Sequence, residues 1–225
     1  AQGKRLVYRE GSDIVAVEGG FELRIPLSEV PLTRHGTIVF QIDNAMAAVG
    51  AAWALDLDWN VIRRGLASFV SDASRTPGRF NVFDYRGATV IADYGHNADA
   101  MHALVQAVEA MPARRRSVVL SAAGDRRDED IRTQAEILGH AFDDVILYED
   151  ACLRGRAPGE TFALLREGLA RARRAQNIRE IRGEFAAIDE ALARLEPGDL
   201  CLILVDQVEA ALAHLQSRLA HAQVV

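Results

Sequence analysis

The sequence predicts an α/β fold: a Rossmann-like, mostly parallel sheet with helices on both faces, preceded by a smaller β/α unit. From residue 81 onward, short apolar runs alternate with longer stretches whose apolar residues recur at helical spacing. Near-continuous apolar runs are typical of parallel strands that are buried on both faces. Before residue 71 the pattern differs, because three short β segments are followed by two helices. These observations predict two domains of different architecture.

The first domain begins with alternating β segments and ends with helices. Strands are predicted over residues 6–8, 14–17 and 21–25, separated by turn-forming residues. An alanine-rich helix is predicted over 45–55, with Asp43-Asn44 as its N-cap, and a second helix over 61–69.

The segment Ser71–Gly78 is small, polar and ends in Pro-Gly, which is typical of a linker. We therefore place the domain boundary so that the domains cover residues 1–75 and 76–225. Strands of the second domain are predicted over 81–85, 88–92, 117–122, 145–148, 178–181 and 200–205. Helices are predicted over 98–111, 128–140, 158–175, 184–195 and 208–219.

The composition is that of an ordinary globular protein, with 49% hydrophobic and 26% charged residues. The net charge of −6 argues against general nucleic-acid binding. Cys152 and Cys201 fit neither a zinc spacing nor a disulfide framework, which favours the reducing cytoplasm. No apolar run approaches the roughly 20 residues that cross a bilayer, so no membrane partner is expected. The missing initiating Met suggests a fragment or a trimmed chain. The sequence leaves open whether the chain forms a homo-oligomer.

Polar side chains follow three of the predicted parallel strands. They are Asp93, His96 and Asn97 after the first; Asp125, Arg126 and Arg127 after the second; and Glu149, Asp150, Arg154 and Arg156 after the third. The carboxyl ends of parallel strands meet at one edge of a sheet, where α/β domains bind ligands. Cations and carboxylates together suit a phosphate-bearing or zwitterionic ligand.

Simpler interpretations of these residues stay open. Asp93 is well placed to cap the following helix, and His96 alone is an ordinary loop histidine. Arg154 and Arg156 also fit solvated loop charges. The histidines form no metal-binding spacing, so no metal site is predicted in the chain. Neither G-x-x-x-x-G-K-[ST] nor G-x-G-x-x-G occurs, so the chain has no phosphate loop of its own.

Three motifs in this order resemble the C-terminal domain of the Mur ligases, which folylpolyglutamate and cyanophycin synthetases share. They are Pro77-Gly78-Arg79, Asp93-Tyr94-Gly95-His96-Asn97 and Gly124-Asp125-Arg126-Arg127. The usual family string is Asp-Tyr-Ala-His-Asn-Pro, from which Gly95 and Ala98 depart. The cyanophycin synthetase branch is most similar, through Gly124–Ile131, Glu149-Asp150, Arg154-Gly155-Arg156 and Gly198-Asp199-Leu200. Residues 1–70 look like the end of the ATPase-like central domain of these ligases.

The resemblance implies an ATP-dependent ligase that activates a peptide carboxylate as an acyl phosphate, which an incoming amine attacks. It implies that Arg79, Asp93, His96 and Asn97 bind ATP, with Arg79 and His96 as catalytic residues. Arg79 would lie near the phosphates, where a cation stabilises the transferred phosphoryl group, and Asp93 near the ribose. The Mg²⁺ ligands and the phosphate loop belong to an earlier part of the central domain.

The same resemblance implies that the other two charged loops bind the incoming amino acid, arginine or aspartate, beside a peptide acceptor. The substrate-binding residues implied are Asp125, Arg126, Arg127, Glu149, Asp150, Arg154 and Arg156. We therefore expect the C-terminal fragment of an amino-acid ligase resembling cyanophycin synthetase, which adds arginine to the aspartate side chain of a poly-aspartate backbone. The fragment alone is expected to be inactive. A non-catalytic Rossmann-like binding module, or a fragment of another Mur or folylpolyglutamate-type ligase, is the alternative.

Overall fold

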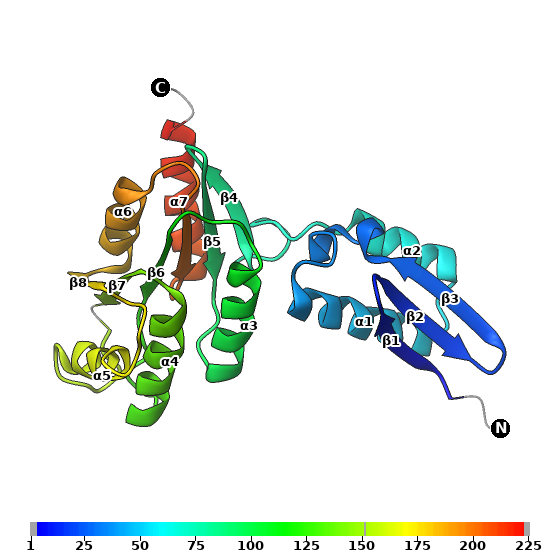
Figure 1. Cartoon of the computed structure of the whole chain (residues 1–225), viewed down its shortest axis with the longest axis horizontal. Coiled ribbons are helices and arrows are strands. Elements are labelled where there is room, and N and C mark those ends of the chain that lie inside the picture. The colour runs from blue at the N-terminus through cyan, green and yellow to red at the C-terminus, as the bar shows by residue number, and fades with distance from the viewer. Residues whose placement is uncertain (1–3, 151, 223–225) are drawn as a thin grey trace. The chain divides into compact units, whose positions relative to one another are not determined.

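The chain forms two compact units, Ala1–Ser71 and Asp72–Val225, which are shown in Figure 1. The structure is a computed structural model that describes residues 4–150 and 152–222. The division between the units falls after Ser71, inside the segment that the sequence marks as a linker, whereas the predicted boundary follows residue 75. Each unit has its own hydrophobic core.

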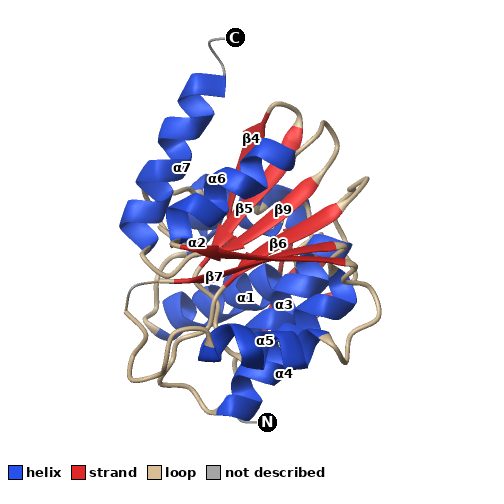
Figure 2. Ribbon diagram, turned by 90° about the vertical axis from the view of Figure 1, so that its left-hand side faces the viewer, coloured by secondary structure: helices blue, strands red, loops and turns tan. Residues whose placement is uncertain are grey.

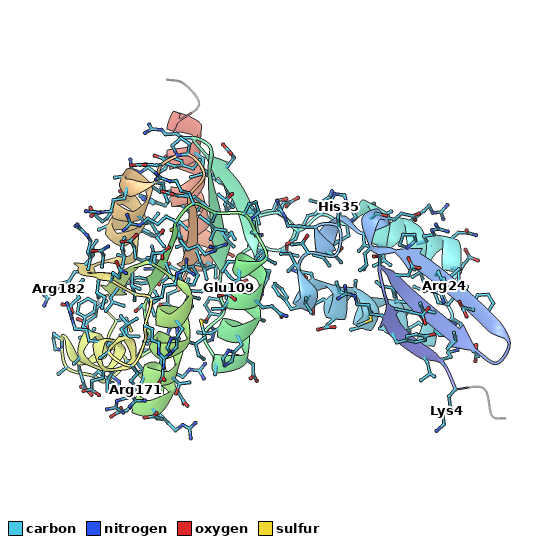
Figure 3. The ribbon with its side chains drawn as sticks, in the orientation of Figure 1. Lys4, Arg24, His35, Glu109, Arg171 and Arg182 are labelled. Carbon is cyan, nitrogen blue, oxygen red and sulfur yellow. The ribbon has the colours of Figure 1, made fainter. Side chains whose placement is uncertain are left out.

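The first unit is an antiparallel sheet packed against helices. The strands β1 (Leu6–Glu10), β2 (Asp13–Glu18) and β3 (Phe21–Pro26) lie in the order β1-β2-β3. Two short 3-10 helices, η1 (Leu27–Glu29) and η2 (Pro31–Thr33), lead into α1 (Val39–Ala54) and α2 (Trp59–Ser68). Alternate strand residues such as Ile14 and Ile25 pack on α1, while the strand residue Arg24 is partly exposed (Figure 3).

Helix α1 begins at Val39, well before the predicted residue 45, and Asp43 and Asn44 lie inside it. The prediction that these two residues cap the helix is therefore wrong. Ile38 occupies the N-cap position without a side-chain hydrogen bond, and Ile42 in the first turn is fully buried. Apolar packing of the first turn thus decides where this helix starts, and packing contributes more to helix stability than local propensity does.

The second unit contains a six-stranded sheet in the order β4-β5-β9-β6-β7-β8. The strands are β4 (Asn81–Tyr85), β5 (Ala88–Asp93), β6 (Arg116–Leu120), β7 (Asp144–Glu149), β8 (Asn177–Arg182) and β9 (Leu200–Leu204). Strands β4 and β5 form the predicted hairpin, and both turn residues, Arg86 and Gly87, have positive φ, as a two-residue turn requires. All other pairings are parallel, which confirms the predicted α/β fold.

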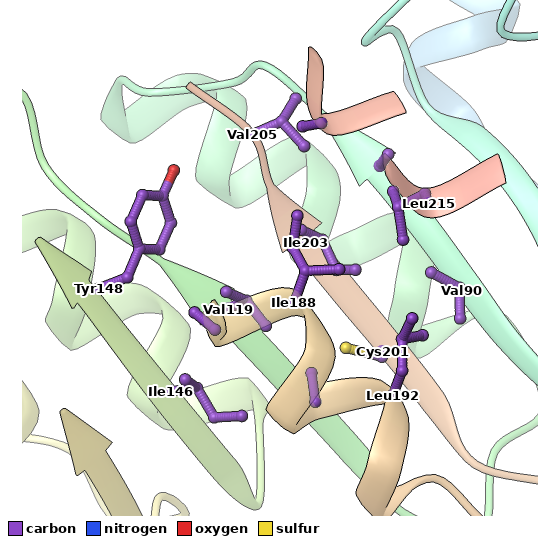
Figure 4. Close-up of a cluster of buried hydrophobic side chains, with 14 of the residues drawn as sticks. Val90, Val119, Ile146, Tyr148, Ile188, Leu192, Cys201, Ile203, Val205 and Leu215 are labelled. Atoms are coloured by element: carbon purple, nitrogen blue, oxygen red, sulfur yellow. The ribbon is translucent and has the colours of Figure 1, made fainter. Parts of the chain in front are cut away.

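Helices cover both faces of this sheet (Figure 2). Helices α6 (Glu184–Arg194) and α7 (Val208–Ala222) lie on one face, and α3 (Ala98–Glu109), α4 (Asp128–Ala141) and α5 (Glu160–Leu169) lie on the other. Cys201 and Ile203 of β9 join the core under α6 and α7 (Figure 4). The alternation of strand side chains places Leu202 on the opposite face. No helix among the described residues is long and apolar enough to cross a membrane.

The position of β9 determines where a ligand site can form. The chain runs outward from β5 through β6 and β7 to β8, and then returns to place β9 between β5 and β6. Because crossover connections are right-handed, the returning helix α6 lies on the opposite face from α3, α4 and α5. The carboxyl ends of β5, β9, β6 and β7 therefore lie side by side at the point where the strand order reverses, which is where open α/β sheets bind ligands.

Helix α5 is shorter than predicted. It ends at Leu169, and residues 170–175, which we expected to continue it as a surface helix, form turns instead. The backbone N–H of Ala175 donates to the carbonyl of Gly139 at the end of α4, at 2.9 Å. Arg171 lies in this turn segment (Figure 3). Hydrogen bonds to the neighbouring helix thus outweigh the high helix propensity of this alanine- and arginine-rich segment.

Candidate functional site

A cavity of about 240 Å³ lies at the carboxyl edge of the six-stranded sheet. The last residues of β7 and β9 line it with the residues that follow β5, β6, β7 and β9, together with one residue of α5. The described lining residues are Tyr94, Gly95, His96, Ser121, Ala122, Ala123, Gly124, Asp125, Arg126, Tyr148, Glu149, Asp150, Cys152, Leu153, Arg154, Thr161, Leu204, Val205 and Asp206. The charged loops that the sequence places at one sheet edge therefore do surround one cavity.

Asp93, the last residue of β5, is buried and holds two loops together. One carboxylate oxygen accepts the backbone N–H of Gly95 at 2.6 Å, and the other accepts the backbone N–H of Phe80 at 2.8 Å. Burial raises the pKa of Asp93, and these two hydrogen bonds and the positive charge of Arg79 oppose that rise. Asp93 therefore ties the segment that carries Arg79 to the end of β5.

The helix cap belongs to Asn97, not to Asp93. The side-chain oxygen of Asn97 accepts the backbone N–H of Ala100 at 2.8 Å and caps α3, so the interpretation of Asp93 as a cap is wrong. His96 is half-buried, and its Nδ1 lies within hydrogen-bonding distance of the carbonyl of Tyr94. Of the four predicted ATP-binding residues, only His96 is among the described residues that line the cavity. Asp93 and Asn97 lie near His96 in the chain, and Arg79 lies in the segment that Asp93 ties to the end of β5.

Arg79 is presented by a tightly anchored turn. Its neighbours Gly78 and Phe80 are buried and have positive φ, while Arg79 itself is exposed. The carbonyl of Gly78 accepts the backbone N–H of Tyr94 at 2.8 Å, and the Arg79 guanidinium lies 5.9 Å from the centre of the Tyr94 ring. The ring of Tyr94 in turn meets His96 edge-on. Arg79 and His96 thus flank the same aromatic ring.

The loops after β6 and β7 approach each other so closely that only glycine fits at one position. A Cβ atom on Gly124 would lie 2.1 Å from the carbonyl oxygen of Leu153. Beside this crossing, the Arg154 guanidinium lies 3.7 Å from a carboxylate oxygen of Asp125 and 3.5 Å from one of Asp206. All three side chains are substantially exposed, so these ion pairs add little stability and can exchange partners with a ligand.

Two predicted substrate-binding residues lie outside the cavity. Arg127 is 85% exposed and pairs with Asp130 in the first turn of α4. The Arg156 side chain is only 11% exposed and donates to the carbonyls of Gly124 and Arg126, at 2.8 and 2.7 Å. Arg156 therefore holds the shape of the loop after β6, while Asp125, Arg126, Glu149, Asp150 and Arg154 line the cavity.

Glu149, the last residue of β7, and Asp150, which follows it, differ in their surroundings. Glu149 is buried, and both its oxygens lie 3.0 Å from the backbone nitrogen of Gly159, so it tethers the loop that leads to α5. Asp150 is half-buried, and it accepts the side-chain amide of Gln207 at 2.7 Å. Asp150 is therefore the more available of the two for a ligand.

Residues at the fourth strand end, after β9, are not among the predicted site residues. Asp206 follows β9 and lines the cavity, and Tyr148 and Cys152 of the β7 segment also line it. Asp206 is a polar residue directly after an apolar strand, which is the same signal that identified the other three loops. Among the described residues, no group of three or more His, Cys, Asp or Glu side chains is arranged to hold a metal ion.

The chain is similar to known proteins along nearly its whole length. The chain is 35% identical to the cyanophycin synthetase of Crocosphaera subtropica over 217 residues, which are 96% of this chain and 25% of that protein. It is 33% identical to the Synechocystis cyanophycin synthetase over 96% of the chain and 25% of that protein. The chain thus spans about a quarter of the length of these curated relatives.

Solved structures show the same fold. E. coli FolC in complex with ADP, without folate substrate, superposes with a TM-score of 0.67 at 24% identity, covering 98% of this chain and 47% of that one. Residues 78–204 match the family described as "Mur ligase, glutamate ligase domain". These residues include β5, β6, β7 and β9 and nearly all of the cavity lining. The chain belongs to the Mur ligase family, through its glutamate ligase domain.

Proposed function

We propose that this chain is the C-terminal part of a longer, cytoplasmic, ATP-dependent ligase that joins the amine of an amino acid to a peptide carboxylate through an acyl phosphate. The identity to cyanophycin synthetases along nearly the whole chain, and the quarter of their length that it spans, support this proposal. The reaction we propose is the addition of arginine to aspartate side chains of a poly-aspartate backbone.

The position of Arg154 between two carboxylates is the main observation that supports an amino-acid site in the cavity. A free amino acid has a carboxylate and an ammonium group, which require a guanidinium and a carboxylate as partners. Arg154, with Asp125 and Asp206 at 3.7 and 3.5 Å, offers both kinds of partner at one point of the cavity. Asp150 and the buried Glu149 add two more carboxylates, against Arg126 and Arg154 as cations. This excess of negative charge favours an amino acid with a cationic side chain, such as arginine, over aspartate.

The turn that presents Arg79 fits one side of a nucleotide site. We propose that Arg79 contacts the ATP phosphates and that His96 lies at the boundary between the nucleotide and the amino-acid cavity. Asp93 and Asn97 already accept backbone hydrogen bonds, so they shape the loop and offer ATP only their remaining acceptor capacity. E. coli FolC and the MurF ligase of Thermotoga maritima, which share this fold, were both solved with ADP. The Mg²⁺ ligands belong to the earlier part of the proposed ligase.

The first unit fits the end of a larger central domain. An apolar groove of about 380 Å³ runs along α1, α2 and the 3-10 segment of this unit. Its lining is apolar apart from Asn44, and Leu57 and Val61 are each 45% exposed. Exposed apolar grooves of this kind mark surfaces that another part of a protein covers. We propose that residues 1–75 complete the ATPase-like central domain of the ligase.

Amino-acid binding by the 225-residue chain tests the proposed site. We expect isothermal titration calorimetry to detect L-arginine binding that exceeds L-aspartate binding. Arg154→Ala should weaken L-arginine binding at least about tenfold, because it removes the partner of the substrate carboxylate. Arg127→Ala is the matched control, since it removes an exposed guanidinium outside the cavity. Equal affinity in both variants, or a preference for L-aspartate, would contradict the proposed site.

The isolated chain is expected to have no ligase activity, because its sequence contains no phosphate loop. The test is to incubate the chain with ATP, Mg²⁺, an aspartate-containing primer and arginine, and to measure ADP. We expect ADP release at the level of a no-protein control. ADP release that depends on both primer and arginine would refute this expectation.

A further inference from the structure

Glu184, the first residue of α6, is a charged side chain buried beneath the cavity. It is 1% exposed, and its carboxylate accepts the backbone N–H of Asp206 at 2.8 Å and that of Gln207 at 3.1 Å. These residues connect β9 to α7, which begins at Val208. Two helix N-termini therefore meet at this carboxylate, an arrangement that favours its negative charge.

Asp206 and Gln207, which donate to Glu184, both contact the loop that follows β7 at the cavity. The Asp206 carboxylate lies 3.5 Å from the Arg154 guanidinium, and the Gln207 side chain donates to Asp150 at 2.7 Å. The hydroxyl of Tyr148, whose ring is drawn in Figure 4, donates to the carbonyl of Leu204 at 3.0 Å and so fixes the end of β9. Glu184 is thus linked through one backbone segment to two residues of the proposed amino-acid site.

We propose that Glu184 is a positioning residue for the amino-acid site: it fixes residues 206–207 so that Asp206 and Gln207 set the places of Arg154 and Asp150. This inference rests on the proposed function of the cavity. Glu184 itself does not line the cavity, so it acts through the loop and not by contact with a ligand. A carboxylate suits this task because it accepts two converging N–H groups, whereas the amide of glutamine turns a donor toward one of them.

Asp199 provides a matched control at the other end of the same strand. It is also buried, and its carboxylate accepts the backbone N–H of Glu196 at 3.0 Å and the side chain of Arg114 at 3.1 Å. It lies at the amino end of β9, away from the cavity. Asp199→Asn therefore removes a buried, hydrogen-bonded charge without touching the site.

The binding test compares Glu184→Gln and Asp199→Asn with the unaltered 225-residue chain. We expect Glu184→Gln to weaken L-arginine binding about tenfold, because one of the two N–H groups loses its acceptor and the loop shifts. Asp199→Asn should lower the melting temperature without changing this affinity. Unchanged L-arginine affinity in folded Glu184→Gln would overturn the proposal, and so would an equal loss in Asp199→Asn.

Nuclear magnetic resonance gives a second readout that does not depend on ligand binding. We expect Glu184→Gln to move the backbone amide signals of Asp150 and Arg154 as well as those of Asp206 and Gln207. If the unaltered chain binds neither L-arginine nor L-aspartate, the proposed amino-acid site fails. The positioning role of Glu184 is then judged from the amide signals of Asp150 and Arg154 alone. If these signals do not move in Glu184→Gln, the proposed role is overturned.

If Glu184→Gln does not fold, a pH titration of the unaltered chain tests the positioning role of Glu184 instead. Burial raises the pKa of Glu184, the hydrogen bonds from the backbone N–H groups of Asp206 and Gln207 oppose that rise, and the nearby charges of Asp206 and Asp150 add to it. The amide signals of Asp206 and Gln207 should titrate with Glu184. Tyr148 stays neutral over this pH range because burial raises its pKa well above its ordinary value. L-arginine affinity should fall, as pH is lowered, with the same midpoint as these amide signals. Constant affinity through that midpoint would overturn the proposal.

Discussion

Replacing Arg79 with alanine is expected to lower the turnover of the proposed longer ligase by about 100-fold or more. The reason is that phosphoryl transfer depends on cationic groups placed in advance beside the developing charge, and loss of one such group typically costs 10²–10³ in rate. The turn that carries Arg79 is anchored at both sides through Gly78 and Phe80, so the backbone that presents the guanidinium is held in place before ATP binds. ADP release with saturating ATP, primer and arginine measures the effect.

Arg86→Ala is the control for this experiment. Arg86 lies at the far end of the same hairpin, where its guanidinium is 5.3 Å from the centre of the Tyr85 ring, much as Arg79 lies over Tyr94. The two substitutions therefore remove similar cation–aromatic contacts, but only one is near the proposed nucleotide site. Arg86→Ala should leave turnover nearly unchanged. Near-normal turnover of the Arg79→Ala enzyme would reject the assignment of Arg79 to ATP.

Gly168→Ala is expected to destabilise the second unit by about 1–3 kcal/mol, or more if α5 cannot shift. A Cβ atom at Gly168 would lie 2.2 Å from the carbonyl oxygen of Arg132 and 2.8 Å from the Cβ of Ala135. The first of these is a backbone atom of α4, so relief requires moving one helix against the other. Urea denaturation followed by far-UV circular dichroism measures the loss in free energy of unfolding.

Two internal references make this stability experiment specific. Both tryptophans, Trp53 and Trp59, lie in the first unit, so their fluorescence reports that unit and should keep its transition in Gly168→Ala. Gly65→Ala is the matched helical control, because a Cβ there meets no atom within 4 Å. It should be stabilising by about 0.5–1 kcal/mol, since alanine has the higher helix propensity. A Gly168→Ala chain as stable as the original would show that the α4–α5 contact is looser than described.

The alternation of apolar runs and helical stretches predicted the parallel sheet, because both patterns arise from local periodicity of the chain. The same alternation predicted that Asp125, Glu149 and His96 would meet at one sheet edge, and they line one cavity. It did not predict that Asp206 belongs with them. Asp206 also follows an apolar strand, but its place beside these residues depends on β9 returning between β5 and β6, which is a pairing between segments distant in the sequence.

Sequence patterns also failed where packing competes with propensity. Helix α1 starts early because its first turn is buried, and α5 ends early because the following segment bonds to the end of α4. Similarly, Arg154 and Arg156 are two residues apart in one loop, yet one lines the cavity and the other donates to the backbone of the loop after β6. Local sequence does not distinguish two arginines whose partners lie on other elements.

By itself, the sequence determined the fold class, the family and the polar strand ends, because each of these follows from local periodicity or from short motifs. The tertiary structure alone decided which side chains share the cavity, and it revealed Glu184 beneath the loop that carries Asp206. The physical reason is that strand order and loop crossings depend on contacts between distant segments, and these contacts set the burial and partners of each charge.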